Sequence, residues 1–342
     1  MMRTPINEQE LNDLISQPWK KLIDFFKELP GDISILGANG KIGLSLSLMA
    51  KKAIEMANVD KKLYAVSRFS SEEGRLLLES HGITTIACDL SNREEVQKLP
   101  KTENVIFMAG RKFGTEGAEP YTWAKNVLVP AICVEHFKES RIVAFSTGCV
   151  YPLVSKESGG SVESDRPEPI GEYSQSCLGR ERVFEYYSLI QKTPALLLRL
   201  NYSTDLRYGV LCDIAKKIWN DEPVITDNEY FNISWQGDVN NYTLLSLSEC
   251  TFPANYLNIT GPEILSVKEV AEEMAEIMGK KVVVKCTGTD RSYLNNAEKS
   301  FKLYGKPSVT AKKLIRMQAE WTMQGGKELN IPTHFEVGDG KF

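Results

Sequence analysis

The chain has 342 residues, of which 42% are hydrophobic and 25% charged, so its composition is that of a globular protein and excludes the disordered and fibrous classes. Its 41 basic and 45 acidic residues give a net charge of −4, which is too small and too evenly spread to favour a nucleic-acid partner. The 7 cysteines occur singly and the 3 histidines lie far apart, so neither a disulfide framework nor a metal site is expected.

The start of the chain gives expectations about location. The opening MMRTPINEQE lacks the apolar core of a signal peptide, and no apolar run reaches the ~18 to 20 residues that cross a bilayer. We therefore expect a cytoplasmic protein with no membrane partner.

A helical extension is predicted for residues 1–31. Apolar residues recur at three- and four-residue spacing between Leu11 and Leu29, and Pro18 interrupts them. Since proline is tolerated only in a first helical turn, two short helices are expected rather than one. Their apolar face is expected to pack against the main domain.

Short apolar runs alternate with longer helical stretches from residue 32 onward; the runs are DISIL, LYAV, ITTIAC, NVIFMA, RIVAF and ALLLRL. Continuous apolar strands separated by helices indicate a parallel sheet that is buried on both faces. Residues 32–200 are therefore predicted to form an α/β Rossmann-type domain with a doubly wound sheet. The pattern weakens after residue 200, and residues 201–342 are expected to form a smaller α/β substrate-binding lobe.

The motif GANGKIG follows the first predicted strand and opens a helix, which is the context that makes a glycine pattern informative. Glycines permit a tight turn and let backbone amides approach a diphosphate, whose charge the helix N-terminus favours. The sequence therefore predicts a dinucleotide site formed by Gly37, Asn39, Gly40, Lys41, Ile42 and Gly43.

The ends of the next two strands bear on the choice of cofactor. Ser67 and Arg68 stand where an NAD-binding protein commonly has an acidic residue, and they favour the 2′-phosphate of NADP over NAD. Arg68 as a solvated surface charge is the alternative. Asp89, followed by Leu90, is placed to accept a hydrogen bond from an adenine amine, or else to cap a helix.

With these motifs, the sequence from about Ile33 to about Gly279 resembles the NAD-dependent epimerase/dehydratase family of the extended short-chain dehydrogenase/reductase superfamily, the branch that contains the UDP-galactose 4-epimerases. The resemblance is most specific over GANGKIG, FSTGCVYP and YSQSC. It aligns Thr147 with the family's catalytic Ser or Thr, Tyr173 with its catalytic tyrosine, and Asn126 with its helix asparagine.

The resemblance also implies an NAD(P) cofactor, a carbohydrate-derived small-molecule substrate, and a homodimer formed by the helices that begin near Tyr121 and Tyr173. At the end of the fourth strand, Ala109, Gly110 and Lys112 are expected to lie at the cofactor. The residues expected at the substrate are Arg111, Tyr151, Asn201 and Arg207; Arg207 and Arg199 are also candidates for salt bridges.

Cys177 departs from the family pattern, because a lysine is expected four residues after the catalytic tyrosine. Bringing the tyrosine pKa from about 10 to neutrality requires about 4 kcal/mol of preferential stabilisation of the phenolate, which a nearby cation normally supplies. Cys177 lies one helical turn from Tyr173 and is kept as a candidate site residue, but in an apolar site it is expected to be a neutral thiol.

Three interpretations remain open. Another cation replaces the lysine, with Arg111 and Lys112 as candidates and Arg180 expected to point along its helix. Alternatively, the chain is a non-redox proton-transfer enzyme that catalyses epimerisation, elimination or lactone opening. The third is a catalytically silent NAD(P)-binding sensor. The leading expectation is an epimerase/dehydratase-like oxidoreductase.

Overall fold

A seven-stranded parallel sheet forms the centre of the structure, which is a computed structural model that describes residues 3–288, 290–331, 333–338 and 340. Parts of the predicted segments 1–31 and 201–342 lie outside the described residues, namely residues 1–2, 289, 332, 339 and 341–342. The strands of the sheet are β1 Ile33–Leu36, β2 Leu63–Ser67, β3 Thr84–Ala87, β4 Asn104–Phe107, β5 Arg141–Thr147, β7 Ala195–Leu200 and β12 Asn255–Ile259.

The direction in which successive strands are added to the sheet reverses at its centre, between β1 and β4. The order is β12-β7-β5-β4-β1-β2-β3, and every neighbouring pair is parallel. From β1 the chain winds outward to β2 and β3, and it then returns to β4 on the other side of β1. In doubly wound sheets, ligands bind at the carboxyl ends of the strands at such a reversal. The loops after β1 and β4 therefore border the place where a ligand is expected.

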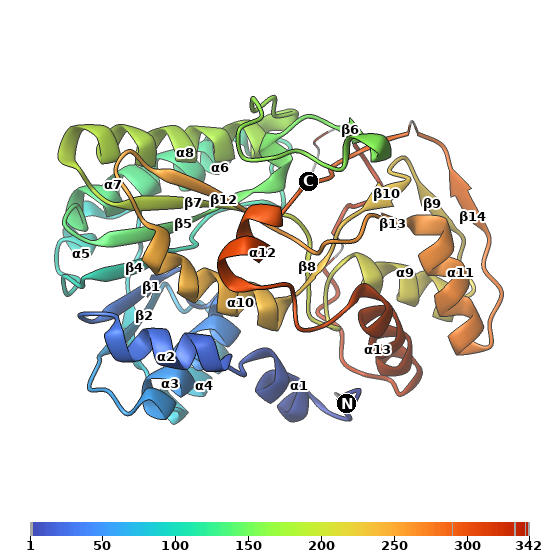
Figure 1. Ribbon diagram of the computed structural model, residues 1–342, viewed down its shortest axis with the longest axis horizontal. Helices are drawn as coiled ribbons and strands as arrows, with labels where there is room; N and C mark the ends of the chain where they lie inside the picture. Colours follow the sequence, from blue (N-terminus) through green and yellow to red (C-terminus); the bar gives the residue numbers. More distant parts are fainter. Residues whose placement is uncertain (1–2, 289, 332, 339, 341–342) are drawn as a thin grey trace.

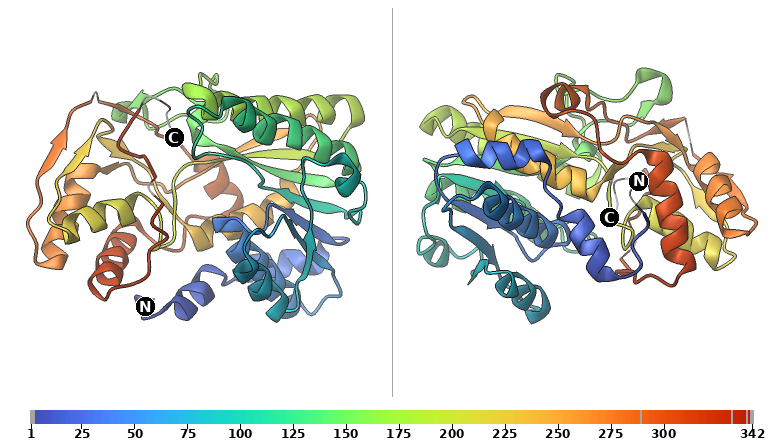
Figure 2. Two further views of the ribbon diagram at one scale, coloured as in Figure 1. Left: turned by 180° about the vertical axis from the view of Figure 1, so that it is seen from behind. Right: turned by 60° about the horizontal axis from the view of Figure 1, so that its bottom comes forward.

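Helices cover both faces of the sheet (Figures 1 and 2). One layer shares a core with Ile33 and Ile35 of β1, and the other shares a core with Leu36. The predicted α/β doubly wound fold is confirmed. The first layer contains α2 Lys20–Glu28, α3 Lys41–Ala57, α4 Glu72–Ser80 and α10 Gln236–Leu245; the second contains α5 Arg93–Val96, α6 Glu119–Trp123, the π-helical turn η1 Ala124–Leu128, α7 Val129–His136 and α8 Gly171–Gln191.

The two predicted N-terminal helices are present as α1 Glu8–Ile15 and α2, with Pro18 between them. Leu22 and Phe26 of α2 are fully buried in the core beneath α3. Leu11 and Ile15 of α1 instead join the core of the C-terminal lobe. The extension therefore packs on the sheet layer, as predicted, and also connects that layer to the lobe.

The C-terminal lobe lies beside the carboxyl ends of the strands and is organised around three amphipathic helices, α9 Val210–Trp219, α11 Val267–Met278 and α13 Ala311–Met323 (Figure 1). Two segments of the predicted 201–342 lobe lie with the sheet instead, because α10 packs on α3 and β12 pairs with β7. The remaining elements are β6 Val154–Ser155, β8 Ser203–Thr204, β9 Val224–Thr226, β10 Tyr230–Phe231, β11 Ser234–Trp235, β13 Leu265–Ser266, β14 Val284–Cys286, β15 Arg291–Ser292, α12 Glu298–Tyr304 and the 3₁₀ turns η2 Gly148–Val150, η3 Lys156–Ser158 and η4 Ser246–Glu249.

The helices of the described residues give no support for a transmembrane segment, since none is both long and apolar enough to span a bilayer. The cytoplasmic location stays a prediction.

Candidate functional site

The glycine loop between β1 and α3 has the close packing that its sequence predicts. Gly37 has φ +96°, and a Cβ at this position would lie 2.8 Å from the backbone nitrogen of Ala109. A Cβ at Gly43 would lie 2.5 Å from the Ala38 carbonyl oxygen, so helix and loop approach closely. Gly40 is the N-cap of α3 and offers no side chain to the first-turn amides. These amides, which have no acceptor within the helix, suit an anion such as a diphosphate.

A cavity of about 270 Å³ lies on the β2 and β3 side of this loop. It brings together predicted cofactor residues from four separate stretches of the sequence, which supports one elongated ligand across the loop. Its lining residues are Gly37, Asn39, Gly40, Ser67, Arg68, Ser70, Cys88, Asp89, Leu90, Met108, Ala109, Gly110, Lys125 and Val129.

Asp89 lies in this cavity, and its helix-capping interpretation is wrong. The residue that caps α5 is Asn92, whose side chain accepts from the Glu94 and Glu95 amides. Asp89 instead accepts hydrogen bonds from the Ser91 hydroxyl and amide, which lower the pKa of its carboxyl to about 2. At neutral pH the cavity therefore presents an ionised carboxylate, with the Lys125 ammonium 3.4 Å away.

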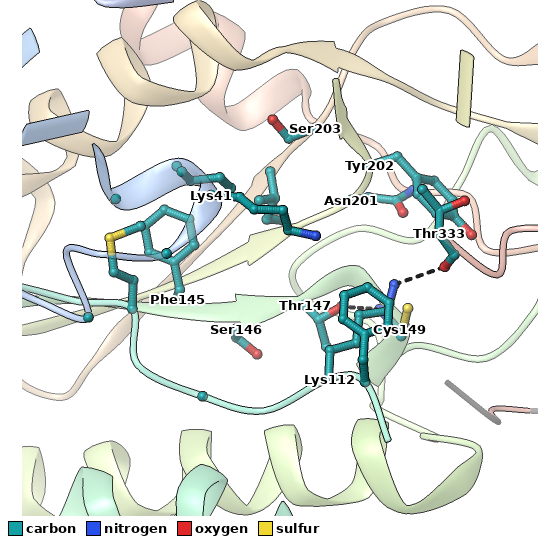
Figure 3. A pocket seen from close by; sticks show the side chains of 18 of the residues that line it. Lys41, Lys112, Phe145, Ser146, Thr147, Cys149, Asn201, Tyr202, Ser203 and Thr333 are labelled. Atoms are coloured by element: carbon teal, nitrogen blue, oxygen red, sulfur yellow. Dashed lines mark hydrogen bonds between the residues drawn. The ribbon is translucent and has the colours of Figure 1, made fainter. Parts of the chain in front are cut away.

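A second cavity, of about 290 Å³, adjoins the other side of the loop and faces the C-terminal lobe (Figure 3). The two cavities share Gly37, Gly40, Met108 and Gly110, so they form one continuous crevice over the sheet. The predicted site residues that line the second cavity are Gly37, Gly40, Lys41, Ile42, Gly43, Gly110, Arg111, Lys112, Thr147, Tyr173 and Asn201.

Thr147 and Tyr173 meet in this second cavity. Thr147 is the last residue of β5, and Tyr173 lies in the first turn of α8. Burial is the main influence on the Tyr173 phenol and raises its pKa well above its usual value near 10, against the opposite effects of Arg180 and the Thr147 hydroxyl. The phenol is consequently protonated at neutral pH and can give a proton to a substrate oxygen held by the two hydroxyls.

Cys177 is fully buried one turn further along α8 and does not line the cavity. Burial is the main influence on the thiol and raises its pKa to about 11, against the opposite effects of Arg180 and Tyr173. This direction agrees with the expectation of a neutral thiol. Cys177 therefore supplies neither the charge nor the proton relay of a lysine.

Arg180 corrects one sequence-based expectation, because it reaches into the site instead of pointing along its helix. Its side chain is buried and lines the second cavity. The guanidinium donates to the Phe145 carbonyl at 2.8 Å and to Asn126 Oδ1 at 2.6 Å. Its positive charge opposes the effect of burial on the pKa of Tyr173. Arg180 is thus a fixed cation on the same helix as the tyrosine.

Asn126 lies behind the cavity wall, in the π-helical turn η1, and is fully buried. Besides Arg180, its Oδ1 accepts from the Arg111 amide at 2.8 Å, and its Nδ2 donates to the Arg111 carbonyl and to Ser176 Oγ, each at 2.9 Å. The widened turn and these bonds give Asn126 a positioning role between the β4 loop and α8.

Lys112 is the second cation near Tyr173. Its Nζ is 5.9 Å from the centroid of the Tyr173 ring and donates to the Thr333 carbonyl at 3.4 Å. Burial lowers the pKa of this lysine. The neighbouring Arg111 bonds to the Gly114 carbonyl through its guanidinium, so it stabilises the loop on which Lys112 stands.

Two predicted substrate residues do not line the second cavity. Tyr151 is buried behind it, donates to Asn258 Oδ1 at 2.9 Å and accepts from Arg199 at 2.7 Å. Arg207 is held by Asp205 through two of its nitrogens, at 3.2 and 2.7 Å. Both make structural contacts in place of the predicted substrate contacts.

Several cavity residues were not predicted from the sequence. Cys149 lies within FSTGCVYP, and Phe113 and Tyr202 each follow a predicted site residue, but these side chains were not singled out. The others, which no spacing connects to the motifs named above, are Ser203, Tyr208, Gln236 and Thr333. The loop after β7 is strained, because Tyr202 and Leu206 have φ values of 35° and 58°. Within the described residues, no cluster of three His, Cys, Asp or Glu side chains could hold a metal ion.

Comparison with known proteins gives a structural match only. No protein-family model matches the sequence, and no curated protein matches it. A solved UDP-galactose 4-epimerase superposes with a TM-score of 0.69 at 20% identity, covering 86% of this chain and 99% of the other. The chain has the fold of the nucleotide-sugar epimerases.

Two further solved structures extend this match. The UDP-glucuronic acid 4-epimerase from Bacillus cereus, a point mutant in complex with a fluorinated UDP-glucuronic acid and NAD, gives a TM-score of 0.71 at 18% identity, covering 86% of this chain and 99% of the other. The dTDP-glucose 4,6-dehydratase from Bacillus anthracis, in complex with NAD, gives 0.72 at 17% identity, covering 85% and 96%. The resemblance inferred from the sequence is confirmed for the fold.

Proposed function

We propose that this chain is an NAD(P)-dependent enzyme of the epimerase/dehydratase type that acts on a sugar or sugar-derived substrate. The observation that carries the proposal is that Thr147 and Tyr173 line the same crevice as the glycine loop. The shared fold with enzymes whose structures contain NAD and nucleotide sugars supports the cofactor and the substrate class.

The crevice fits a nicotinamide dinucleotide. The α3 amides and Gly37, where any side chain would collide with Ala109, would hold the diphosphate. Ser67, Arg68, Asp89 and Leu90 would hold the adenosine end. When bound, the nicotinamide accepts or donates a hydride.

The side chains of this protein would orient a substrate oxygen and move one proton. The Thr147 hydroxyl holds the oxygen, and Tyr173 Oη gives it a proton or takes one from it. We assign the missing lysine's electrostatic role to Arg180, because its guanidinium is buried and fixed by two carbonyl oxygens. Its charge would lower the pKa of Tyr173.

The choice between NADP and NAD is a finer part of the proposal. Ser67 and Arg68 both line the cavity on the β2 and β3 side of the glycine loop, and Arg68 is exposed there. We propose a preference for NADP, because a cation and a hydroxyl can bind a 2′-phosphate. The similar solved structures contain NAD, so the affinities of this protein for NADP and NAD should be compared directly.

The test is turnover by the purified protein with each dinucleotide and a panel of UDP-glucose, UDP-galactose, UDP-glucuronic acid and dTDP-glucose. Absorbance of the reduced nicotinamide and analysis of the sugar products report the reaction. Tyr173→Phe should lower turnover by about 10²- to 10⁴-fold and leave dinucleotide binding unchanged. Tyr186→Phe, on the exposed face of the same helix, is the matched control. Equal turnover by Tyr173→Phe and the wild type would contradict the proposal.

A non-redox proton-transfer enzyme is the second candidate. It is favoured by the raised pKa of Tyr173, which keeps the phenol protonated, and by the cysteine in place of a lysine at position 177. Exchange of substrate protons with deuterated solvent, with no change in nicotinamide absorbance, would favour this candidate. Dinucleotide binding with neither reaction on any substrate would favour a sensor.

A further inference from the structure

The side chain of Lys41 leaves the glycine loop and crosses the second cavity toward Asn201 and Tyr202 (Figure 3). Its ammonium lies 3.3 Å from the centroid of the Tyr208 ring and 4.8 Å from that of Phe113. Tyr208 belongs to the segment that leads into α9 of the lobe. The backbone of Lys41 is thus at the predicted cofactor site, whereas its charge is at the lobe side of the crevice.

The charge of Lys41 is poorly compensated by its surroundings. The Lys112 ammonium lies 5.3 Å from the centroid of the same Phe113 ring, so a second cation faces the same space. Burial and the charge of Lys112 together lower the pKa of Lys41 to about 8, against the opposite effect of Asp205 and Asp213. Both carboxylates are already engaged, Asp205 by Arg207 and Asp213 by the Thr333 amide and hydroxyl.

A hydroxyl in the same cavity also lacks a partner. Ser203 Oγ is buried and makes no hydrogen bond with any described residue. It lines the second cavity together with Lys41, above that side chain in Figure 3. A buried donor without an acceptor is costly, as is a largely buried ammonium that contacts mainly aromatic faces. An anionic ligand with oxygen atoms would satisfy both groups.

We propose that the substrate of this enzyme carries an anionic group, a carboxylate or a phosphate ester, that binds to Lys41 and Ser203 at the lobe side of the cavity. This inference rests on the proposed function, since it names the substrate class of that same site. A cofactor diphosphate is the competing occupant, but the α3 amides already suit that group, and the ammonium is directed away from them onto Phe113 and Tyr208.

Calorimetric titration of the full-length protein, saturated with NADH or NADPH, tests the proposal with matched probes. D-glucuronate and D-glucose 6-phosphate are compared with D-glucose, and UDP-glucuronic acid with UDP-glucose. At least one probe with the added carboxylate or phosphate should bind about tenfold or more tightly than its counterpart without that group. Tighter binding of the glucuronates alone assigns the group as a carboxylate, and tighter binding of the 6-phosphate alone assigns it as a phosphate.

For each pair of probes, Lys41→Met should bring the ratio of the two dissociation constants, with and without the added anionic group, close to one. Ser203→Ala should change this ratio in the same direction but only in part. Lys41→Gln repeats the test should the methionine variant fold poorly. Lys20→Met, at an exposed lysine on α2, is the control and should keep the wild-type ratio.

Three results would overturn the inference. They are equal binding by the wild type of each probe with the added anionic group and its counterpart without it, an unchanged ratio in both Lys41 variants, or a loss of dinucleotide affinity as the main effect of Lys41→Met. Failure of the proposed function looks different, because the protein would then bind neither NADH nor NADPH, or would bind them without turning over any nucleotide sugar. The same probes can then be titrated against the protein without a dinucleotide. Tighter binding of a probe with the added carboxylate or phosphate would support the anion site, and only the cofactor assignment would be withdrawn.

Discussion

At the scale of single residues, the site depends on which group near Tyr173 carries positive charge. We expect Cys177→Ala to keep turnover within about threefold of the wild type, because a buried neutral thiol contributes no charge. Arg180→Met should raise the pKa of Tyr173, whose phenol must be protonated to act as the acid, and so move the alkaline limb of the kcat/KM profile to higher pH. The pH dependence of kcat/KM for both variants measures this.

The control for this prediction is Arg180→Lys, which retains a cation that can reach the same carbonyl oxygens. It should return the alkaline limb toward its wild-type position, although a lysine has fewer donors. An alkaline limb that does not move in Arg180→Met, together with a large loss in Cys177→Ala, would reverse the assignment of the two residues.

At the scale of secondary-structure elements, one buried ion pair joins α8 to the sheet. Arg199 of β7 and Glu181 of α8 form two hydrogen bonds, at 2.9 and 2.8 Å, with side chains only 3% and 0% exposed. Ser146 donates to the same carboxylate at 2.6 Å. The pair holds α8, and with it Tyr173, against the end of β5.

Removal of one partner should leave an uncompensated buried charge. We expect Glu181→Leu or Arg199→Met alone to lower the free energy of unfolding by about 3 to 5 kcal/mol. The double variant should lose much less than the sum of the two. Urea unfolding of the three variants measures the coupling, and Lys20→Met, in an exposed pair with Asp24, should change stability by about 0.5 kcal/mol or less. Additive losses would contradict a coupled pair.

At the scale of the whole molecule, Asp238 connects the sheet layer to the lobe. It lies in the first turn of α10 and accepts from Ser308 Oγ at 2.5 Å, the Ser308 amide at 2.9 Å and the Val309 amide at 3.3 Å, just before α13. Burial is the main cause that raises the pKa of this carboxyl to about 6 from an ordinary value of 3.8. Folding therefore favours the protonated form of Asp238.

The sign of the resulting pH dependence follows from this shift. Stability due to the Asp238 proton is fully present below pH 3.8 and is lost as the pH rises through about 6. Relative to Asp238→Asn, the wild type should therefore gain about 2 kcal/mol of unfolding free energy between pH 7 and pH 4. Chemical denaturation of both proteins at several pH values measures the difference. A difference that does not vary with pH would contradict the shift.

The expected homodimer stays a prediction, and the surface of α6, η1 and α8 supports it. These elements pack side by side and leave large apolar side chains 50% to 69% exposed, namely Tyr121, Leu128, Tyr186, Leu189 and Ile190. Light scattering should give twice the 38.4 kDa of one chain. Leu189→Glu with Ile190→Glu should give the monomer mass, and Leu76→Glu, on exposed α4, should not. A monomeric wild type would contradict the prediction.

The fold was predictable where buried strands appear in the sequence as short apolar runs. Six of the sheet strands lie in the short apolar runs of the sequence, and each was expected. The seventh strand, β12, was not, because Asn255 and Asn258 interrupt its apolar pattern. Asn258 is nevertheless fully buried, with its amide satisfied by the carbonyl oxygens of Ser161 and Asn296. A buried polar residue with full hydrogen bonding is invisible to a hydrophobicity pattern.

The site was predictable as a set of positions but not as a set of side-chain directions. The glycine pattern identified the loop, and the family resemblance identified Thr147 and Tyr173, because backbone geometry fixes where they lie. Neither foresaw that Arg180 turns inward or that Lys41 reaches the lobe, because a long side chain ends several ångströms from its own backbone. Contacts with the lobe decide the direction of Lys41, and they come from residues far away in the sequence.

The central claim is that the crevice over the glycine loop binds a nicotinamide dinucleotide beside Thr147 and Tyr173. Fluorescence titration of the purified chain with NADPH and NADH tests it most directly, with Gly40→Val as the variant whose side chain would fill the loop. Saturable binding is expected at one site per chain in the wild type, with at least about tenfold weaker binding in folded Gly40→Val. No binding of either nucleotide by the wild type, or equal binding by the variant, would contradict it.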